Sequence, residues 1–347
     1  MHRLETKINC PKNISSSKKL VFSPYSNVAG GSKSLRLKCL LNMTEAPSDT
    51  ANHQRLDEML LHLTPIGAVI PYSICFDSEG SLWVASKGGI FKINKDTKAV
   101  LWEKRNEFPK KMMAFCQIHA FQDKVIHIQT GEGDLTEFRI LNLDGSVETE
   151  SFIDGKVQSF VINTKGDMFL TKQPVAGDEF LIYKTTFDCP IGWNDFCSAY
   201  DYCFQALCLL DDDTLVAATT TVPINICSKQ TLKIIDANSG KILQSFSEAG
   251  KSDGQIFFPR SIQSYNNEVL VMDKTGRFQR FNKEGKFLGI GAEIDSYLGN
   301  GFIVQGDEAI VVCSGIVLAP DGETVCDDWL EAVKLDGSKW KTTGKPQ

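Results

Sequence analysis

Short apolar runs separated by polar turns recur along the chain from about residue 70. In the clearest copy, residues 73–76, 82–85, 90–93 and 99–102 are mainly apolar or aromatic, and Gly, Asp, Asn, Lys or Ser residues lie between them. Runs of this length bounded by turn-forming residues are typical of β-strands. The copy therefore predicts four short strands connected as a meander.

The four-strand pattern occurs six times. The second strands contain Leu82, Val125, Met168, Leu215, Val269 and Ala309, with spacings of 43, 43, 47, 54 and 40 residues. A repeat of about 40 to 50 residues is typical of propeller blades, because one blade cannot bury both of its faces and stacking in a ring buries them against neighbours. The sequence predicts an all-β fold, a six-bladed β-propeller over residues 58–342. Residues 1–57 are then a disordered or targeting extension, and residues 343–347 a tail.

A closed ring needs an outermost strand for its last blade. Residues 59–69 contain two apolar groups, Met59–Leu63 and Ile66–Val69, and precede the first predicted strand. The rival segment, Lys339-Trp340-Lys341, is short and polar. Since an outer strand still favours apolar alternation, the N-terminal segment is the preferred candidate.

The fifth copy is the most regular. It reads Phe258-Pro259-Arg260-Ser261-Ile262, then Val269-Leu270-Val271-Met272-Asp273, then Arg277-Phe278-Gln279-Arg280-Phe281. This pattern is similar to the NHL repeat, within the broader TolB-like class of six-bladed propellers. The resemblance implies the six-bladed architecture, and some NHL propellers bind RNA through lysines and arginines around the channel. A RING-type Cys/His array or B-box of the kind attached to some family members is not found in the sequence.

Charge is unevenly distributed in a chain whose net charge is -6. Residues 1–60 carry nine basic and five acidic residues, leaving 28 basic and 38 acidic residues in the remainder. A body that acidic disfavours nucleic acid as a partner. The 11 cysteines are an odd number, and several lie within apolar runs, which favours buried reduced thiols in an intracellular protein. No apolar stretch reaches the 18 residues or more of a membrane span.

The first 44 residues contain one acid, Glu5, and eight basic residues. Their composition is typical of a disordered tail, and it also fits an organellar transit peptide, which is basic, rich in Ser and poor in acids. The expected location is therefore cytoplasmic, with organellar import through residues 1–44 as the alternative.

The chain offers little for catalysis or metal binding. Cys189, Cys197, Cys203 and Cys208 are too far apart for the close pairs of a structural zinc site. Asp211-Asp212-Asp213 lies at a predicted turn, where solvated aspartates are common. The sequence has no nucleophile elbow and no glycine-rich phosphate loop. We therefore expect no catalytic residue, no metal ligand and no cofactor.

The starts of the inner strands supply the remaining candidates. Six-bladed hydrolases resembling the SMP-30 and paraoxonase classes hold Ca²⁺ there with oxygen ligands, and only Asp201 and Asn300 in this chain suit that role. The other residues at these positions are polar or aromatic, and Tyr and Arg are enriched at protein-binding hot spots. The predicted binding face consists of Tyr72, His119, Tyr202, Arg260 and Asn300. The preferred function is a monomeric, non-catalytic scaffold for a protein or peptide, with a metal-dependent hydrolase and RNA binding as alternatives.

Overall fold

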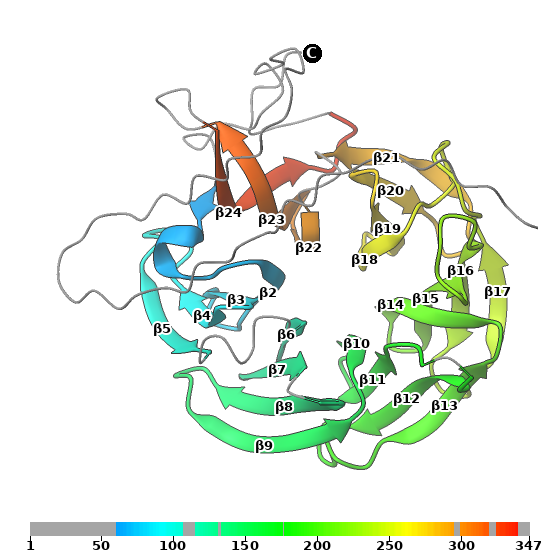
Figure 1. The fold of residues 1–347 in the computed structure, drawn as a ribbon, viewed down its shortest axis with the longest axis horizontal. Helices are drawn as coiled ribbons and strands as arrows, with labels where there is room; N and C mark the ends of the chain where they lie inside the picture. The colour runs from blue at the N-terminus through cyan, green and yellow to red at the C-terminus, as the bar shows by residue number, and fades with distance from the viewer. Residues whose placement is uncertain are drawn as a thin grey trace, which may run out of the picture. The chain divides into compact units, whose positions relative to one another are not determined.

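The computed structural model describes residues 60–106, 115–130, 133–175, 177–294, 299–318 and 324–338. These residues form six four-stranded antiparallel sheets arranged as blades around a central axis (Figure 1). The predicted all-β, six-bladed propeller is therefore confirmed. The expected extension over residues 1–57, the transit-peptide candidate 1–44, the segment 339–341 and the tail 343–347 lie outside the described residues.

Each blade runs outward from an inner strand. Blade 1 comprises β2 (Pro71–Phe76), β3 (Leu82–Ser86), β4 (Gly89–Ile93) and β5 (Val100–Arg105). Blade 2 comprises β6 (Cys116–Phe121), β7 (Lys124–Thr130), β8 (Leu135–Asn142) and β9 (Val147–Asp154). Blade 3 comprises β10 (Val157–Ile162), β11 (Asp167–Lys172), β12 (Phe180–Thr186) and β13 (Asn194–Ala199). Blades 4 and 5 comprise β14 (Tyr202–Asp211), β15 (Thr214–Thr221), β16 (Gln230–Asp236) and β17 (Ile242–Phe246); and β18 (Pro259–Tyr265), β19 (Glu268–Asp273), β20 (Arg277–Phe281) and β21 (Phe287–Glu293). Blade 6 contains β22 (Gly299–Gln305), β23 (Glu308–Leu318) and β24 (Thr324–Lys334).

The ring closes through the N-terminal side of the described chain. β1 (Leu61–His62) pairs antiparallel with β24, with Leu61 opposite Leu330 and His62 opposite Trp329. A short 3-10 helix, η3 (Thr64–Ile66), then leads into blade 1. The last blade thus takes its outermost strand from the segment 59–69, as predicted.

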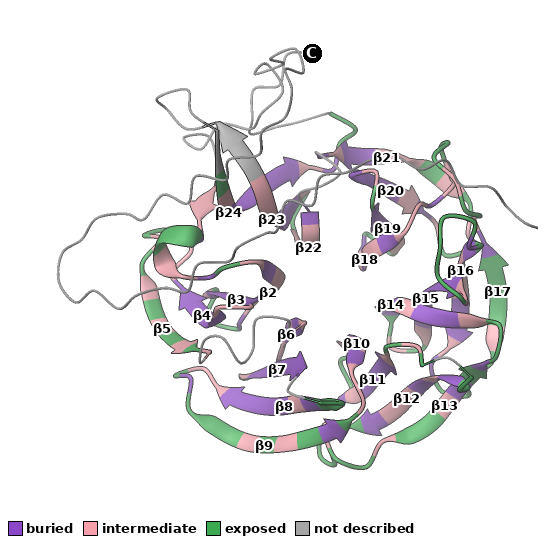
Figure 2. Ribbon diagram, in the orientation of Figure 1, coloured by how far each residue is buried: buried purple, intermediate pink, exposed green. Residues whose placement is uncertain are grey.

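Burial falls from the middle of each blade to its outer edge (Figure 2). Every residue of β3 and β4 is buried, whereas intermediate and exposed residues alternate along β5. A strand covered on both faces reads as a continuous apolar run, and one with a solvated face alternates. This difference explains why the middle strands gave the clearest signal in the sequence.

The core consists of six apolar clusters, each between two neighbouring blades. Between blades 1 and 2, for example, the fully buried Trp83 shares a cluster with Ile118. Between blades 3 and 4, Phe169 and Phe204 share another. Because every cluster needs two blades, a single blade would leave these side chains in water, and the ring is the smallest unit that buries them all.

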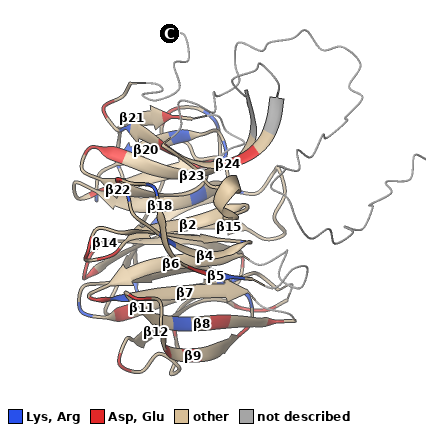
Figure 3. Ribbon diagram, turned by 90° about the vertical axis from the view of Figure 1, so that its left-hand side faces the viewer, with Lys and Arg blue, Asp and Glu red and all other residues tan. Residues whose placement is uncertain are grey.

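The two faces of the ring follow from the antiparallel order of the strands. The inner strands begin at one face, called here the entry face, where the loops between blades also lie. The opposite face carries the turns between first and second strands and between third and fourth strands, including Asp212-Asp213 between β14 and β15. The edge-on view in Figure 3 shows acidic and basic residues interspersed along the loops and strands.

Six of the nine described cysteines are buried, and all nine are free thiols, in agreement with the expectation of mostly buried thiols. Burial raises the pKa of Cys208 to about 12, so this thiol stays protonated. Among the elements that the structure describes, no helix has the length and apolar character needed to cross a membrane.

Candidate functional site: a polar central channel

A β-bulge interrupts five of the six inner strands close to the entry face. The register with the second strand shifts at Tyr72, Gln158, Gln205, Arg260 and Asn300, whereas β6 pairs with β7 without a break. A bulge adds one residue to a strand and turns its side chain away from the regular alternation, often next to a functional site. Here all five bulged residues line the central channel.

The channel contains a cavity of about 210 Å³ to which all six inner strands contribute. Its polar lining residues are Tyr72, Ser73, Gln117, His119, Gln158, Ser159, Gln205, Arg260, Ser261, Gln263 and Asn300. Among the described lining residues Arg260 is the one lysine or arginine, and none is Asp or Glu. The polar part of the lining therefore consists of amides, hydroxyls and one imidazole, with a single cation.

Four of the five predicted binding residues meet in this cavity: Tyr72, His119, Arg260 and Asn300. Tyr202 does not line it. The Tyr202 ring packs edge-on against Phe204, with centroids 5.6 Å apart, and the Lys233 ammonium lies 4.4 Å from the ring centroid. Because the bulge of β14 comes three residues later, Gln205 takes the place that the sequence analysis assigned to Tyr202.

Three more glutamines, Gln117, Gln158 and Gln263, belong to the cavity but not to the predicted binding set. A sequence signal for the bulges does exist, since each bulged residue precedes a small one: Ser73, Ser159, Ala206, Ser261 or Gly301. The small residue is needed where inner strands approach closely. A Cβ on Gly301 would lie 2.4 Å from the carbonyl oxygen of Tyr72.

Arg260 is held by uncharged groups. Its Nη1 donates to the carbonyl oxygen of Gly299 at 2.6 Å and lies 3.4 Å from Oδ1 of Asn300. No carboxylate of the described chain forms an ion pair with it, and burial lowers the pKa of its guanidinium from the usual value. A guanidinium has five N–H donors, so most of the donors of Arg260 remain for a ligand.

Side chains of the inner strands also join the blades to one another. Ser73 Oγ bonds both backbone groups of Ile118, Ser159 Oγ accepts from the Leu207 amide, Gln263 Nε2 donates to Phe302 O, and Asn300 Nδ2 donates to Pro71 O. With Arg260 to Gly299, these bonds link blades 1–2, 3–4, 5–6 and 6–1. Between β6 and β10, and between β14 and β18, the described residues make no such bond.

Polar atoms at the junction of blades 2 and 3 have no partner. Gln117 Oε1 and His119 Nε2 are buried without a hydrogen bond. The His119 ring packs edge-on against Phe160, with centroids 5.1 Å apart, and burial lowers the pKa of His119 to about 4. The imidazole is therefore neutral at physiological pH. A buried polar group without a partner costs about 1–3 kcal/mol, which a bound group can recover.

The donor set is poorly suited to a divalent cation. Ca²⁺ and Mg²⁺ favour several oxygen ligands, most of them carboxylates. Within the described ranges, no three His, Cys, Asp or Glu residues lie close enough to hold a metal ion. Asp201 is exposed and outside the cavity lining, and Asn300 already bonds Pro71, Ser314 and Arg260.

Comparisons with known proteins identify the fold. No protein-family model matches the chain. A gluconolactonase from Xanthomonas campestris is similar with a TM-score of 0.50 and 12% identity, over 79% of this chain and 94% of that one. The computationally designed Ika8 protein matches at a TM-score of 0.49 and 10% identity, over 81% and 99% of the two chains. A hydrazine synthase chain from Kuenenia stuttgartiensis matches at 0.45 and 13%, over 74% of this chain and 65% of its own length.

Proposed function

We propose that this protein is a non-catalytic binding propeller that takes a protein or peptide ligand on its entry face, over the central channel. The observation that carries the proposal is the state of Arg260. This guanidinium is partly buried in a cavity whose described lining contains no carboxylate, and among the described residues it contacts one carbonyl and one amide oxygen.

The size of the cavity supports a ligand that inserts only one group. Sites for drug-sized molecules usually have volumes of about 300–1,000 Å³, and this cavity has about 210 Å³. A side chain or chain end would enter the channel while the rest of the ligand contacts the surrounding loops. Arginines in desolvated central positions are common anchors of such interfaces.

The family relationship and the location remain part of the proposal. An NHL-like, TolB-like propeller fits blade 5, where Asp273 of the NHL-like run ends β19 and accepts hydrogen bonds from the Phe257 amide, Arg277 and Gln279. The buried thiols fit an intracellular protein. One arginine in the described lining gives an RNA backbone little to bind, so RNA is the weaker partner.

Affinity capture with matched variants tests the binding function. Arg260→Ala removes the channel cation, and Arg280→Ala removes one positive charge from the same blade, where Arg280 pairs with Glu268 at 2.7 Å. We expect a stoichiometric partner that the unmodified protein and Arg280→Ala retain and Arg260→Ala loses. Equal recovery with both variants, or no partner above background, would contradict the proposal.

The metal-dependent hydrolase is the second candidate, because the gluconolactonase from Xanthomonas campestris shares the propeller architecture. Elemental analysis of the purified protein and a panel of lactones and aryl esters separate the two functions. We expect neither a stoichiometric divalent metal nor turnover, since the described channel offers no carboxylate to hold the ion. Metal at one equivalent together with lactone hydrolysis would establish the hydrolase instead.

A further inference from the structure

The polar lining of the channel has two unlike sides. Blade 5 contributes the cation, Arg260, while blades 2 and 3 contribute Gln117, His119 and Gln158, none of which hydrogen-bonds a described residue through its side chain. In a six-bladed ring blade 2 lies opposite blade 5, and Figure 1 shows β6 and β18 on opposite sides of the axis. A group that fills the channel therefore meets the guanidinium on one side and the amides and imidazole on the other.

We infer that the channel binds a carboxylate group of the ligand, with Arg260 as its anchor and with Gln117 and His119 bonding the N–H or O–H group next to it. This inference rests on the proposed binding function and specifies its chemistry. A guanidinium offers two parallel N–H donors whose spacing matches the two oxygens of a carboxylate. On the side of the channel formed by blades 2 and 3, Gln117 Oε1 has no hydrogen-bond partner and can accept from an N–H or O–H group of the ligand.

Charge balance favours a single negative charge over a phosphate. The described lining carries one formal positive charge and no acidic residue, so a carboxylate monoanion neutralises the site. A phosphate dianion would leave one negative charge uncompensated in a partly buried site, which is less favourable. His119 does not supply a second positive charge, since burial keeps its pKa at about 4.

Volume limits the inserted group. The cavity of about 210 Å³ is smaller than the usual site for a drug-sized molecule. A carboxylate with a few neighbouring atoms has this size, and two sources of it are possible: a small free acid, or the C-terminal end of a peptide. Both present the same chemistry to Arg260, and length dependence distinguishes them.

Titration of the full chain with N-acetylglycine tests the inference, with N-acetylglycinamide as the neutral control. The probe carries a carboxylate and an adjacent N–H. Losing a charge-assisted hydrogen bond weakens binding by about 10- to 100-fold, so we expect this loss for the amide control and for Arg260→Gln. Arg280→Gln should bind as the unmodified protein does. Arg260→Lys keeps the positive charge but lacks the two parallel N–H donors of the guanidinium, so it should bind N-acetylglycine with intermediate affinity.

A second variant tests the amide side. Gln117→Leu keeps the side-chain size and removes the unpartnered acceptor, so it should weaken N-acetylglycine about 5- to 10-fold and leave acetate, which has no N–H, unchanged. An acetylated tetrapeptide with a free C-terminus that binds at least tenfold more tightly than N-acetylglycine supports a peptide end as the source. Equal affinities support a small acid.

Absence of saturable binding for both N-acetylglycine and the tetrapeptide would overturn the inference. Two other results would also overturn it: equal affinity for N-acetylglycine and N-acetylglycinamide, or equal affinity of Arg260→Gln and the unmodified protein for N-acetylglycine. These outcomes leave the proposed function standing if affinity capture still recovers a partner dependent on Arg260. Failure of the carboxylate site and failure of the binding function are therefore distinguishable.

Discussion

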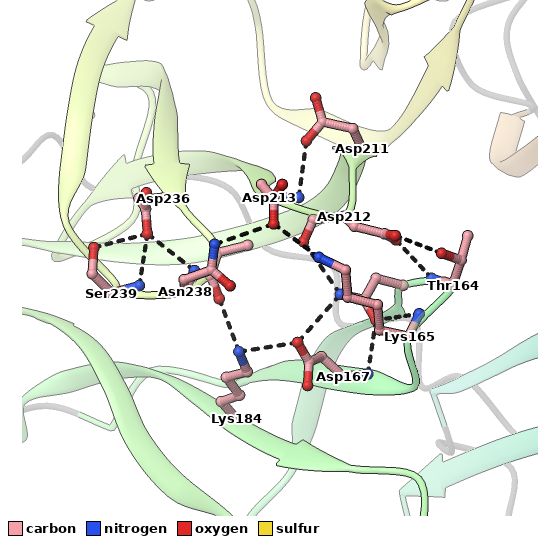
Figure 4. A network of polar contacts seen from close by, with 12 residues as sticks. Thr164, Lys165, Asp167, Lys184, Asp211, Asp212, Asp213, Asp236, Asn238 and Ser239 are labelled. Carbon is pink, nitrogen blue, oxygen red and sulfur yellow. Dashed lines mark hydrogen bonds and ion pairs between the residues drawn. The ribbon is translucent and has the colours of Figure 1, made fainter.

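The central channel and the opposite face of blades 3 and 4 both carry charged side chains, but the charges are paired differently. On the opposite face Lys165 Nζ lies 3.0 Å from Asp213 Oδ1, and Lys184 lies 3.1 Å from Asp167 Oδ2 (Figure 4). Asp212 accepts from both the amide and the hydroxyl of Thr164. The contacts of Lys165 and Thr164 link the β10–β11 turn to the β14–β15 turn, whereas Lys184 and Asp167 pair within blade 3.

In the channel, by contrast, Arg260 contacts only neutral oxygens among the described residues. The ion pairs on the opposite face are complete within the protein, and the Lys165–Asp213 pair joins blade 3 to blade 4. A partly buried cation without an ion-pair partner can still gain from an external anion. The difference indicates that charge on the opposite face serves the fold, while charge in the channel serves binding.

The largest expected effect concerns a buried pair in blade 5. Asp273 is fully buried, and its Oδ2 accepts from the Phe257 amide at 3.1 Å and lies 3.4 Å from Arg277 Nη2. Asp273→Ala leaves a nearly buried guanidinium without its buried carboxylate partner, which costs about 3–5 kcal/mol of unfolding free energy. Urea denaturation measures the loss. A loss of unfolding free energy below about 1 kcal/mol would contradict the interpretation that paired cations stabilise the fold of this chain.

The next effect is pH-dependent and belongs to His119. Because burial lowers its pKa from 6.5 to about 4, the unfolded chain takes up the proton first as the pH falls. The unmodified protein should lose up to about 3 kcal/mol between pH 6.5 and 4 through this residue, at about 1.4 kcal/mol per pKa unit. His119→Gln should lack that component. Denaturation of both proteins at pH 7.5 and 4.5 measures it, and equal pH dependence would show that the imidazole is not desolvated.

Replacement of the channel cation should have a smaller effect on stability. Arg260→Met gives up bonds to Gly299 and Asn300, each worth about 1 kcal/mol, and also removes the cost of a desolvated charge. We expect the unfolding free energy to change by no more than about 1 kcal/mol in either direction while binding is lost. A loss above about 3 kcal/mol would make Arg260 a structural residue and remove the contrast with the opposite face.

The same contrast explains how far the sequence predicted the molecule. Blade count and ring closure followed from apolar runs, because the middle strands are buried on both faces and every blade repeats that requirement. The channel residues depend on backbone irregularities that leave the apolar pattern intact. In β14 the bulge at Gln205 comes three residues after the strand begins. The first residue of the strand, Tyr202, was therefore predicted as the channel residue in place of Gln205. The small residue that follows each bulged residue is visible in the sequence, but only the structure shows that it marks a bulge.

The smallest expected effect is that of the exposed pair between blades 3 and 4. Hydrogen bonds from Lys165 and Asn238 lower the pKa of Asp213, and bonds from the hydroxyl and amide of Thr164 lower the pKa of Asp212. A carboxylate with a lowered pKa stabilises the fold above its unfolded value of 3.8 and loses that contribution as the pH falls below it. Asp212→Ala/Asp213→Ala should therefore lower the thermal midpoint slightly at pH 7 and low salt.

High salt screens exposed pairs, so the deficit of this double variant should shrink in 1 M NaCl and again at pH 3. Thermal unfolding under the three conditions measures both trends, with binding of N-acetylglycine as the control readout. That binding should be unchanged at pH 7, because the substituted turn lies on the face opposite the channel entry. Weaker binding in the double variant would show that the two regions are coupled, and the separation of structural from functional charge would no longer hold.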